Sequence, residues 1–261
     1  MKALLFLVCL LFPFITASSV AYPSVPDCSS SFSDGGEDLQ PLRRETYGSG
    51  WIFDISHRIT SEMPAWGSTD GLGPYLRLRT SMKNGSLANS SEMKLPAHTR
   101  THLDAPGHVF DHYFDAGFYV DSLDMKVLNG PALLVDVPRD KNITAFHVTV
   151  YPRMSVPKFC LFIRRLMYTK EFDTSYAGFT KDGAQRLVDN KDIKLVRVDY
   201  LAVAAYDDAI PSHLVFLEGR EIILAEGLKL DDLPAGIYSV HCLPLRLVRA
   251  EGSPMRCILI N

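Results

Sequence analysis

The stretch that decides how this chain folds is residues 98–108, which read HTRTHLDAPGH. Three of the chain's eight histidines fall within this stretch, together with one aspartate. If residues 98–104 are extended, successive side chains point to opposite faces of the strand. His98, His102 and Asp104 then share one face. We therefore predict a strand that directs two imidazoles and a carboxylate at one point.

The end of the same stretch is expected to bring a third histidine to that point. Pro106 and Gly107 break the predicted strand and allow His108 to turn back toward it. Imidazole and carboxylate groups are the usual ligands of zinc and manganese in proteins. The alternative is a polar loop whose histidines only form hydrogen bonds. Because buried polar groups without partners are costly, we favour a divalent metal site.

The composition is that of a folded domain that acts on a small molecule. The chain has 261 residues, of which 47% are hydrophobic and 22% are charged, so it is not of the disordered class. Lys and Arg number 27 against 30 Asp and Glu, and this balance lacks the basic excess of a nucleic-acid-binding protein. The length is sufficient for one large domain with a buried core.

The first segment has the organisation of a secretory signal. Residues 1–21 read MKALLFLVCLLFPFITASSVA, in which Lys2 precedes an apolar run that small residues follow. A buried N-terminal helix is the alternative. Residues 22–50 are rich in Ser, Gly, Pro and charge, which predicts a mobile arm. The folded domain is expected over residues 51–261.

Two further features bear on the compartment. Three Asn-x-Ser/Thr glycosylation acceptors follow the signal, at Asn84, Asn89 and Asn142. Four cysteines remain after cleavage, Cys28, Cys160, Cys242 and Cys257, and either disulfides or buried thiols are compatible with this number. No second apolar stretch approaches the length of a membrane span. We predict a secreted protein of the extracellular space or matrix, with no membrane span.

Strands are expected to outnumber helices in the folded domain. Apolar runs with turn residues at their ends predict strands at 51–55, 130–137, 159–163, 193–199, 221–226, 236–242 and 256–260. A helix is expected over residues 182–189, and residues 81–95 are expected to be a polar loop. The pattern predicts a single α/β domain.

The motif His98-x-x-Thr101-His102-x-Asp104-x-Pro106-x-His108 resembles the hallmark of the metal-dependent cyclase family. This family includes bacterial-type kynurenine formamidases and isatin hydrolases, and the chain most resembles its plant cyclase-like proteins. Residues 54–57, 63–64 and 199–208 extend the resemblance over about residues 51–260. The resemblance implies an α/β fold with a single mixed-sheet, cyclase-type domain of the swivelling β/β/α-like kind.

The resemblance also implies roles for particular residues. The implied metal ligands are His98, His102, Asp104, His213 and Glu226, with Asp104 able to bridge two ions. His108 matches the family's catalytic histidine. The implied cofactor is one or two divalent ions, zinc or manganese, and the implied substrate is a small-molecule amide. Family members commonly form homo-oligomers, dimers or tetramers. Glu221 competes with Glu226 for the last ligand position.

Two arginines depart from the family pattern. Arg100 stands where relatives usually carry Gly, on the predicted metal-facing side, where a cation would repel a divalent ion by several kcal/mol. Its side chain either swings away or grips a substrate carboxylate. The repulsion motivates a second hypothesis, a catalytically impaired extracellular regulatory protein, for which kinship implies stress or cell-death control. Arg197 is the second departure and is expected to face solvent.

Two other residues have open roles. His57 follows the first predicted strand and either contacts a metal ligand from behind or simply packs. Trp66 either lines an aromatic substrate pocket or belongs to the core.

Overall fold

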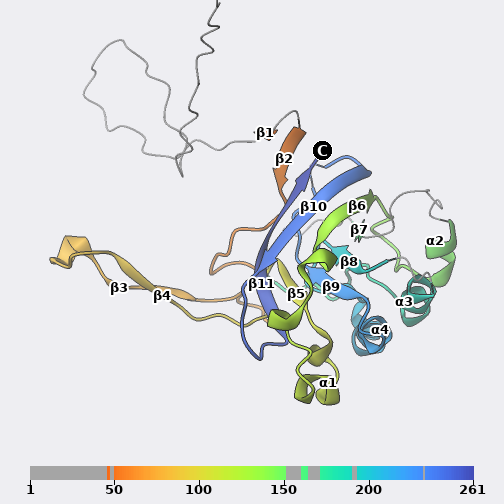
Figure 1. Ribbon diagram of the computed structural model, residues 1–261, viewed down its shortest axis with the longest axis horizontal. Coiled ribbons are helices and arrows are strands. Elements are labelled where there is room, and N and C mark those ends of the chain that lie inside the picture. Colours follow the sequence, from red (N-terminus) through yellow and green to blue (C-terminus); the bar gives the residue numbers. More distant parts are fainter. Residues whose placement is uncertain (1–45, 48–49, 151–159, 164–170, 190–192, 232) are drawn as a thin grey trace, which may run out of the picture. The chain divides into compact units, whose positions relative to one another are not determined.

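The computed structural model describes residues 46–47, 50–150, 160–163, 171–189, 193–231 and 233–261 (Figure 1). The expected signal peptide at 1–21 and most of the expected arm at 22–50 lie outside these residues. Within the described part of the chain, no helix is both long and apolar enough to cross a membrane.

A mixed sheet of nine strands forms the centre of the fold. Its members are β1 Thr46–Tyr47, β2 Gly50–Asp54, β5 His102–Asp104, β6 Asn129–Val135, β7 Cys160–Ile163, β8 Leu195–Val198, β9 Ile223–Glu226, β10 Gly236–Pro244 and β11 Gly252–Ile260. The strand order is β1-β2-β11-β10-β6-β7-β8-β9-β5, and β5 also pairs with β11. The strands from β6 to β9 are parallel and the other pairings are antiparallel. The sheet therefore curls until β5 joins β9 to β11.

Helices and short helical turns connect the strands. They are η1 Met82–Asn84, η2 Pro106–His108, α1 Asp111–Asp115, η3 Val120–Ser122, η4 Met125–Val127, α2 Ala145–Val150, α3 Lys181–Val188, η5 Tyr206–Asp208 and α4 Ala209–Glu218. In Figure 1, α2, α3 and α4 lie together beside the parallel strands. Side chains such as Phe179, Phe216 and Leu224 form an apolar core here. The helices cover this face of the parallel strands, and the apolar side chains on it are therefore buried.

A second core fills the other side of the curled sheet. It contains side chains from β5, β6, β8 and β11, including Leu103, Leu134, Leu195 and Leu259, all of which are buried. Every residue of β8 and β9 is buried. This burial explains why Arg197 does not face solvent: the expectation of an exposed arginine is wrong, and its Nη1 lies 2.7 Å from Cys242 Sγ inside the core.

Cys242 and Cys257 form a disulfide between β10 and β11. The two residues are directly opposite in the antiparallel register. The sequence left disulfides and buried thiols open, and the register decides between them because it places these two sulfurs side by side.

The sequence predicted a polar loop over residues 81–95, but part of this range forms a strand. The antiparallel strands β3 Leu76–Thr80 and β4 Ser90–Met93 form a hairpin that is separate from the large sheet (Figure 1). Leu76 is opposite Met93 and Arg77 is opposite Glu92, so apolar and charged side chains occupy opposite faces. The alternation in Leu-Arg-Leu-Arg-Thr was the signal for this strand.

Several elements lie where the sequence predicted none, among them β1 and the helices α1, α2 and α4. β1 pairs with β2 inside the range expected as an arm. Helix α4 begins after Asp208 and includes Pro211 in its first turn, where the missing N–H of proline costs nothing because the helix offers it no acceptor. The sequence predicted no helix around this proline, yet this helix carries His213.

Candidate metal centre

The register of β5 places a histidine and a glutamate against one another. His102 on β5 pairs with Glu226 on β9, and directly opposite residues have side chains on the same face. His102 Nε2 lies 3.5 Å from Glu226 Oε2 and 3.4 Å from Asp104 Oδ1. These three side chains are buried. Sheet pairing therefore assembles half of the site.

His98 reaches the same carboxylate from the turn that precedes β5. Its Nδ1 donates to Asp104 Oδ1 at 2.8 Å, and its Nε2 lies 3.3 Å from Glu251 Oε1. The imidazole packs flat against β11, where a Cβ added to Gly252 would lie 2.5 Å from His98 Cε1. Gly252 is thus needed for the ring to occupy this position.

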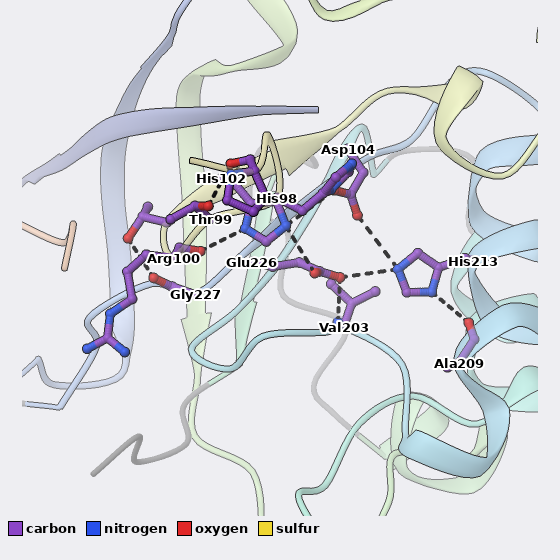
Figure 2. A network of polar contacts seen from close by, with 12 residues as sticks. His98, Thr99, Arg100, His102, Asp104, Val203, Ala209, His213, Glu226 and Gly227 are labelled. Atoms are coloured by element: carbon purple, nitrogen blue, oxygen red, sulfur yellow. Dashed lines mark hydrogen bonds and ion pairs between the residues drawn. The ribbon is translucent and has the colours of Figure 1, made fainter. Parts of the chain in front are cut away.

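His213 enters the cluster from helix α4. Its Nδ1 donates to the Ala209 carbonyl at 2.6 Å, one turn earlier in the helix. The other ring nitrogen, Nε2, lies 3.2 Å from Glu226 Oε1 and 3.6 Å from Asp104 Oδ2 (Figure 2). The helix therefore directs one nitrogen at the two carboxylates.

His108, on η2, lies at the outer side of the cluster. The centroid of its ring is 4.0 Å from that of His98 and 6.0 Å from that of His213. The structure therefore brings together all six residues that the sequence assigned to the metal and to catalysis, namely His98, His102, Asp104, His108, His213 and Glu226.

These residues contain two groups that fit a metal ion. His98, Asp104 and His108 form one, and His102, Asp104 and Glu226 form the other, with potential ligand atoms within 4.8 Å of one another in each group. Asp104 belongs to both. Its Oδ2 is buried and accepts no hydrogen bond from the described residues. A buried carboxylate oxygen that faces imidazoles without a hydrogen bond suits a divalent cation.

The electrostatics of the protein without an ion show how strongly these groups are coupled. Burial lowers the pKa of His98, but the hydrogen bond to Asp104 and the surrounding carboxylates outweigh it and raise the pKa to about 9. Burial likewise lowers the pKa of His213, but Asp104 and Glu226 outweigh this effect and raise the pKa to about 10. Burial acts to raise the pKa of Asp104, and the neighbouring imidazoles of His213, His98 and His102 hold it well below its usual value. Without a metal ion, the protonated rings of His98 and His213 supply the positive charge beside Asp104 and Glu226.

His108 has the opposite shift. Burial lowers its pKa below the usual value, and the neighbouring carboxylates and imidazoles act in both directions. The ring is therefore neutral at pH 7, which is the form that accepts a proton.

The expectation that Arg100 lies on the metal-facing side is wrong. Residue 100 has φ of +57°, so the chain turns there and residues 98–104 are not one extended strand. The side chain points away from the cluster (Figure 2). Its Nη2 lies 3.1 Å from His57 Nδ1. Of the two alternatives for this residue, the structure shows the guanidinium swung away.

The remaining candidates lie outside the cluster. His57 Nε2 donates to the Leu228 carbonyl at 3.1 Å, and burial together with Arg100 lowers its pKa to about 4. Trp66 is 52% exposed and packs on Phe172, with ring centroids 4.6 Å apart, so the alternative of a core tryptophan is wrong. Glu221 pairs at the surface with Lys194 Nζ at 2.7 Å, and Glu226 holds the buried position.

The three glycosylation acceptors are exposed. Asn84 ends η1 between the strands of the hairpin. Asn89 Oδ1 accepts from Met82 N at 2.9 Å, and Asn142 Oδ1 accepts from Gly178 N at 3.3 Å.

Sequence reasoning missed Glu251, Gly252 and Gly227. Glu251 and Gly252 approach His98 only because β11 pairs with β5. Gly227 follows β9 and lies against residue 100, where an added Cβ would be 2.0 Å from the Arg100 carbonyl oxygen. These contacts depend on which strands pair, so no local pattern in the sequence indicated them.

The sequence of the chain matches one protein family over more than half of its length. Residues 53–205 match the Cyclase family, described as "Putative cyclase", and the chain belongs to this family. It is 65% identical over 254 residues to Cyclase-like protein 2 of Arabidopsis thaliana, covering 94% of this chain and 92% of that protein. It is 31% identical to the kynurenine formamidase of Bacillus mycoides (strain KBAB4), covering 81% and 97%.

Solved structures confirm the fold. A potential metal-dependent hydrolase with cyclase activity matches with a TM-score of 0.65 and 25% identity, covering 81% of this chain and 98% of its own. Isatin hydrolase A from Labrenzia aggregata matches with a TM-score of 0.67 and 18% identity, covering 81% and 93%. The resemblance inferred from residues 98–108 is thereby confirmed, and the 31% identity to a kynurenine formamidase supports a metal-dependent, amidohydrolase-like role.

Proposed function

We propose that this protein hydrolyses the C–N bond of a small amide, an aryl formamide or a cyclic amide, with the help of divalent metal. The observation that carries the proposal is the position of Asp104, whose buried carboxylate is shared by two groups of potential ligands. The 31% identity to a kynurenine formamidase supports the substrate class.

The residues that would hold one or two ions of zinc or manganese are His98, His102, Asp104, His213 and Glu226. His108 belongs to one of the two groups, but in this proposal its ring serves proton transfer and is not a ligand. Such an ion, when bound, lowers the pKa of water and polarises a carbonyl oxygen. The chain contributes a buried, preorganised set of ligands, because β5, β9 and α4 fix the directions of the ligand side chains.

His108 is the proposed acid and base. Its neutral ring accepts a proton from the attacking water as the new C–O bond forms, and returns it to the nitrogen as the C–N bond breaks. For a formamide, the products are formate and an amine. The ring is suited to this role because it is neutral near pH 7 and lies beside the ligand His98.

The test combines metal analysis with a substrate panel. Purified protein is expected to contain stoichiometric zinc or manganese and to hydrolyse N-formylkynurenine or isatin. His102→Ala and Asp104→Ala are expected to abolish turnover while circular dichroism shows an intact fold. Protein without stoichiometric divalent metal and inert toward both compounds contradicts the proposal.

The second hypothesis, a catalytically impaired extracellular regulator in stress or cell-death control, has lost its physical reason. It rested on a guanidinium beside the metal, and Arg100 points away from the cluster. The same panel distinguishes the two, since the second hypothesis requires folded protein that turns over no amide.

We propose that the protein is secreted and glycosylated. The apolar segment at residues 1–21, three exposed acceptors and the Cys242–Cys257 disulfide support this localisation. When the full chain is expressed in a eukaryotic secretory host, we expect to find the protein in the culture medium, with an N-terminus directly after Ala21. Its mass is expected to decrease on enzymatic deglycosylation. Retention in the cytosol with an intact N-terminus contradicts it.

We also propose a homo-oligomer, a dimer or tetramer. The hairpin of β3 and β4 supports it, since Leu76, Leu78 and Met93 are all more than half exposed, and a two-stranded hairpin has little stability alone. Light scattering coupled to gel filtration measures the mass, and a monomer at micromolar concentration contradicts the proposal.

A further inference from the structure

Arg100 has a backbone conformation that arginine seldom adopts. Its φ of +57° lies in the left-handed region, which favours glycine because a Cβ crowds the neighbouring carbonyl. In this conformation the Arg100 carbonyl oxygen lies 2.7 Å from His102 Nδ1. A carbonyl can only accept, so Nδ1 carries the proton and donates it.

This hydrogen bond determines which nitrogen of His102 remains available. In a neutral imidazole, one nitrogen carries the proton and the other has a free lone pair. With the proton on Nδ1, the lone pair is on Nε2, the atom that faces Asp104 at 3.4 Å and Glu226 at 3.5 Å. The conformation at residue 100 therefore selects the tautomer that can bind an ion between the carboxylates.

The turn at residue 100 is supported from β9. A Cβ at Gly227 would lie 2.0 Å from the Arg100 carbonyl oxygen, so only glycine permits this approach. Thr101 Oγ1 donates to the Gly227 carbonyl at 2.6 Å, and Gly227 N donates to the Tyr200 carbonyl at 2.7 Å. Gly227 itself has φ of +64°.

The Arg100 side chain adds a second support. Its Nη2 donates to His57 Nδ1 at 3.1 Å. His57 can accept there because its Nε2 donates to the Leu228 carbonyl at 3.1 Å, which leaves Nδ1 without a proton. His57 N also donates to Thr101 Oγ1 at 3.0 Å. The guanidinium thus ties the turn to the segment that follows β2.

We propose that Arg100 is a positioning residue for His102. Its left-handed backbone fixes the Nδ1–H tautomer of His102, and its side chain, bound to His57, holds the turn in place. The inference rests on the proposed function to the extent that His102 is taken as a metal ligand. It gives the departure from glycine at residue 100 a structural role.

The experiment compares four variants. Arg100→Val replaces the residue with a β-branched one that resists positive φ, and Gly227→Ala pushes on the same carbonyl from β9. Arg100→Gly keeps the turn but removes the side chain. Arg220→Val is the matched control, because Arg220 also has φ of +57° but its guanidinium packs over Tyr113 and Phe118.

Two measurements are made on each folded variant. Nitrogen-15 chemical shifts of His102, recorded without metal and with the ring neutral, report the tautomer, and titration with zinc alone reports affinity. We expect Arg100→Val and Gly227→Ala to lose the Nδ1–H tautomer and to bind zinc roughly 10–100-fold more weakly. Arg100→Gly is expected to keep the tautomer with a smaller loss of affinity, and Arg220→Val to match the wild type.

The outcomes separate this inference from the proposed function. If Arg100→Val and Gly227→Ala both retain the tautomer, the inference is wrong. It is also wrong if the tautomer changes while zinc affinity does not, or if Arg220→Val weakens zinc equally. Should Arg100→Val not fold, Gly227→Ala gives the same decision. If the wild type binds no zinc, the proposed metal site fails, and with it the positioning of a ligand, whatever the nitrogen shifts show.

Discussion

At the scale of single residues, the site depends on small groups that leave room as much as on the ligands. Asp104 joins the two candidate ligand groups, and His98 reaches it only because β11 has no side chain at Gly252. Gly227, directly after β9, serves the same purpose against the carbonyl of Arg100. Glycines opposite the ligands thus decide where the imidazoles can lie.

Gly252→Ala is expected to displace the ring of His98 and weaken metal binding. The added Cβ would lie 2.5 Å from Cε1 of the ring, which is far inside van der Waals contact. We expect a loss of zinc affinity of roughly tenfold or more, measured by competition with a chromogenic chelator. Gly236→Ala on β10 is the control, since its Cβ would meet nothing closer than a Tyr238 carbon at 3.8 Å. Equal affinity in the two variants contradicts the role of Gly252.

At the scale of elements, the pairing of strands and one helix bring the proposed ligands together. Strand β5 supplies His102 and Asp104, and its pairing with β9 supplies Glu226. Helix α4 supplies His213 and fixes its ring through the Ala209 carbonyl. The pairing of β10 with β11 carries the disulfide and supports the strand on which His98 packs.

Replacing both cysteines by alanine is expected to destabilise the β10–β11 pair. The bond closes a loop with a sequence separation of 15, for which the entropy of the unfolded chain predicts about 3 kcal/mol of stabilisation. Urea unfolding of Cys242→Ala/Cys257→Ala against the oxidised wild type measures the difference. The reduced wild type is the control and is expected to lose stability as well. Identical midpoints in all three samples contradict the prediction.

At the scale of the whole molecule, the cluster couples folding, protons and metal. Four histidines and two acids meet in this cluster, from β5 and the turns beside it, from α4 and from β9. In the metal-free protein, His98 and His213 have pKa values of about 9 and about 10 and are protonated at pH 7. Both the affinity for metal and the stability of the fold must therefore change with pH.

Metal binding is expected to release protons and to strengthen as pH rises. A histidine must be neutral to ligate, so at pH 7 an ion displaces about two protons from His98 and His213. The apparent affinity is expected to increase steadily from pH 7 toward pH 9. Calorimetry in buffers of different ionisation enthalpy counts the protons. Binding at pH 7 without proton release contradicts the predicted protonation of these rings.

The metal-free fold is expected to lose stability in alkali and in acid. For a histidine with a raised pKa, the stabilisation is complete below the unfolded value of 6.5 and is lost as pH rises through about 9 for His98 and about 10 for His213. For Asp104, whose pKa is lowered, it is present above 3.8 and lost as pH falls below that value. Urea midpoints measured with chelator at pH 6 and pH 10 test the alkaline loss. Zinc-loaded protein is the control and is expected to lose less between these two values.

The sequence by itself determined the types of the candidate ligands and the positions of most strands. Residues 98–108 carry the ligand types, and the apolar runs located strands such as β6, β9 and β11, because burial and alternation are local properties of the chain. The sequence did not predict helix α4, because Pro211 was not recognised as part of its first turn, and it did not predict the hairpin strand β3. It also failed at residues 98–101, since alternation cannot show a residue with positive φ.

Tertiary structure alone decided which groups face one another. The direction of Arg100, the burial of Arg197 and the approach of Glu251 to His98 all follow from the order in which strands pair. Strand order is set by the packing of the entire core, and contacts between residues that are far apart in the sequence leave no periodic trace in the chain. The residue types came from the sequence, and their distances and protonation came from the fold.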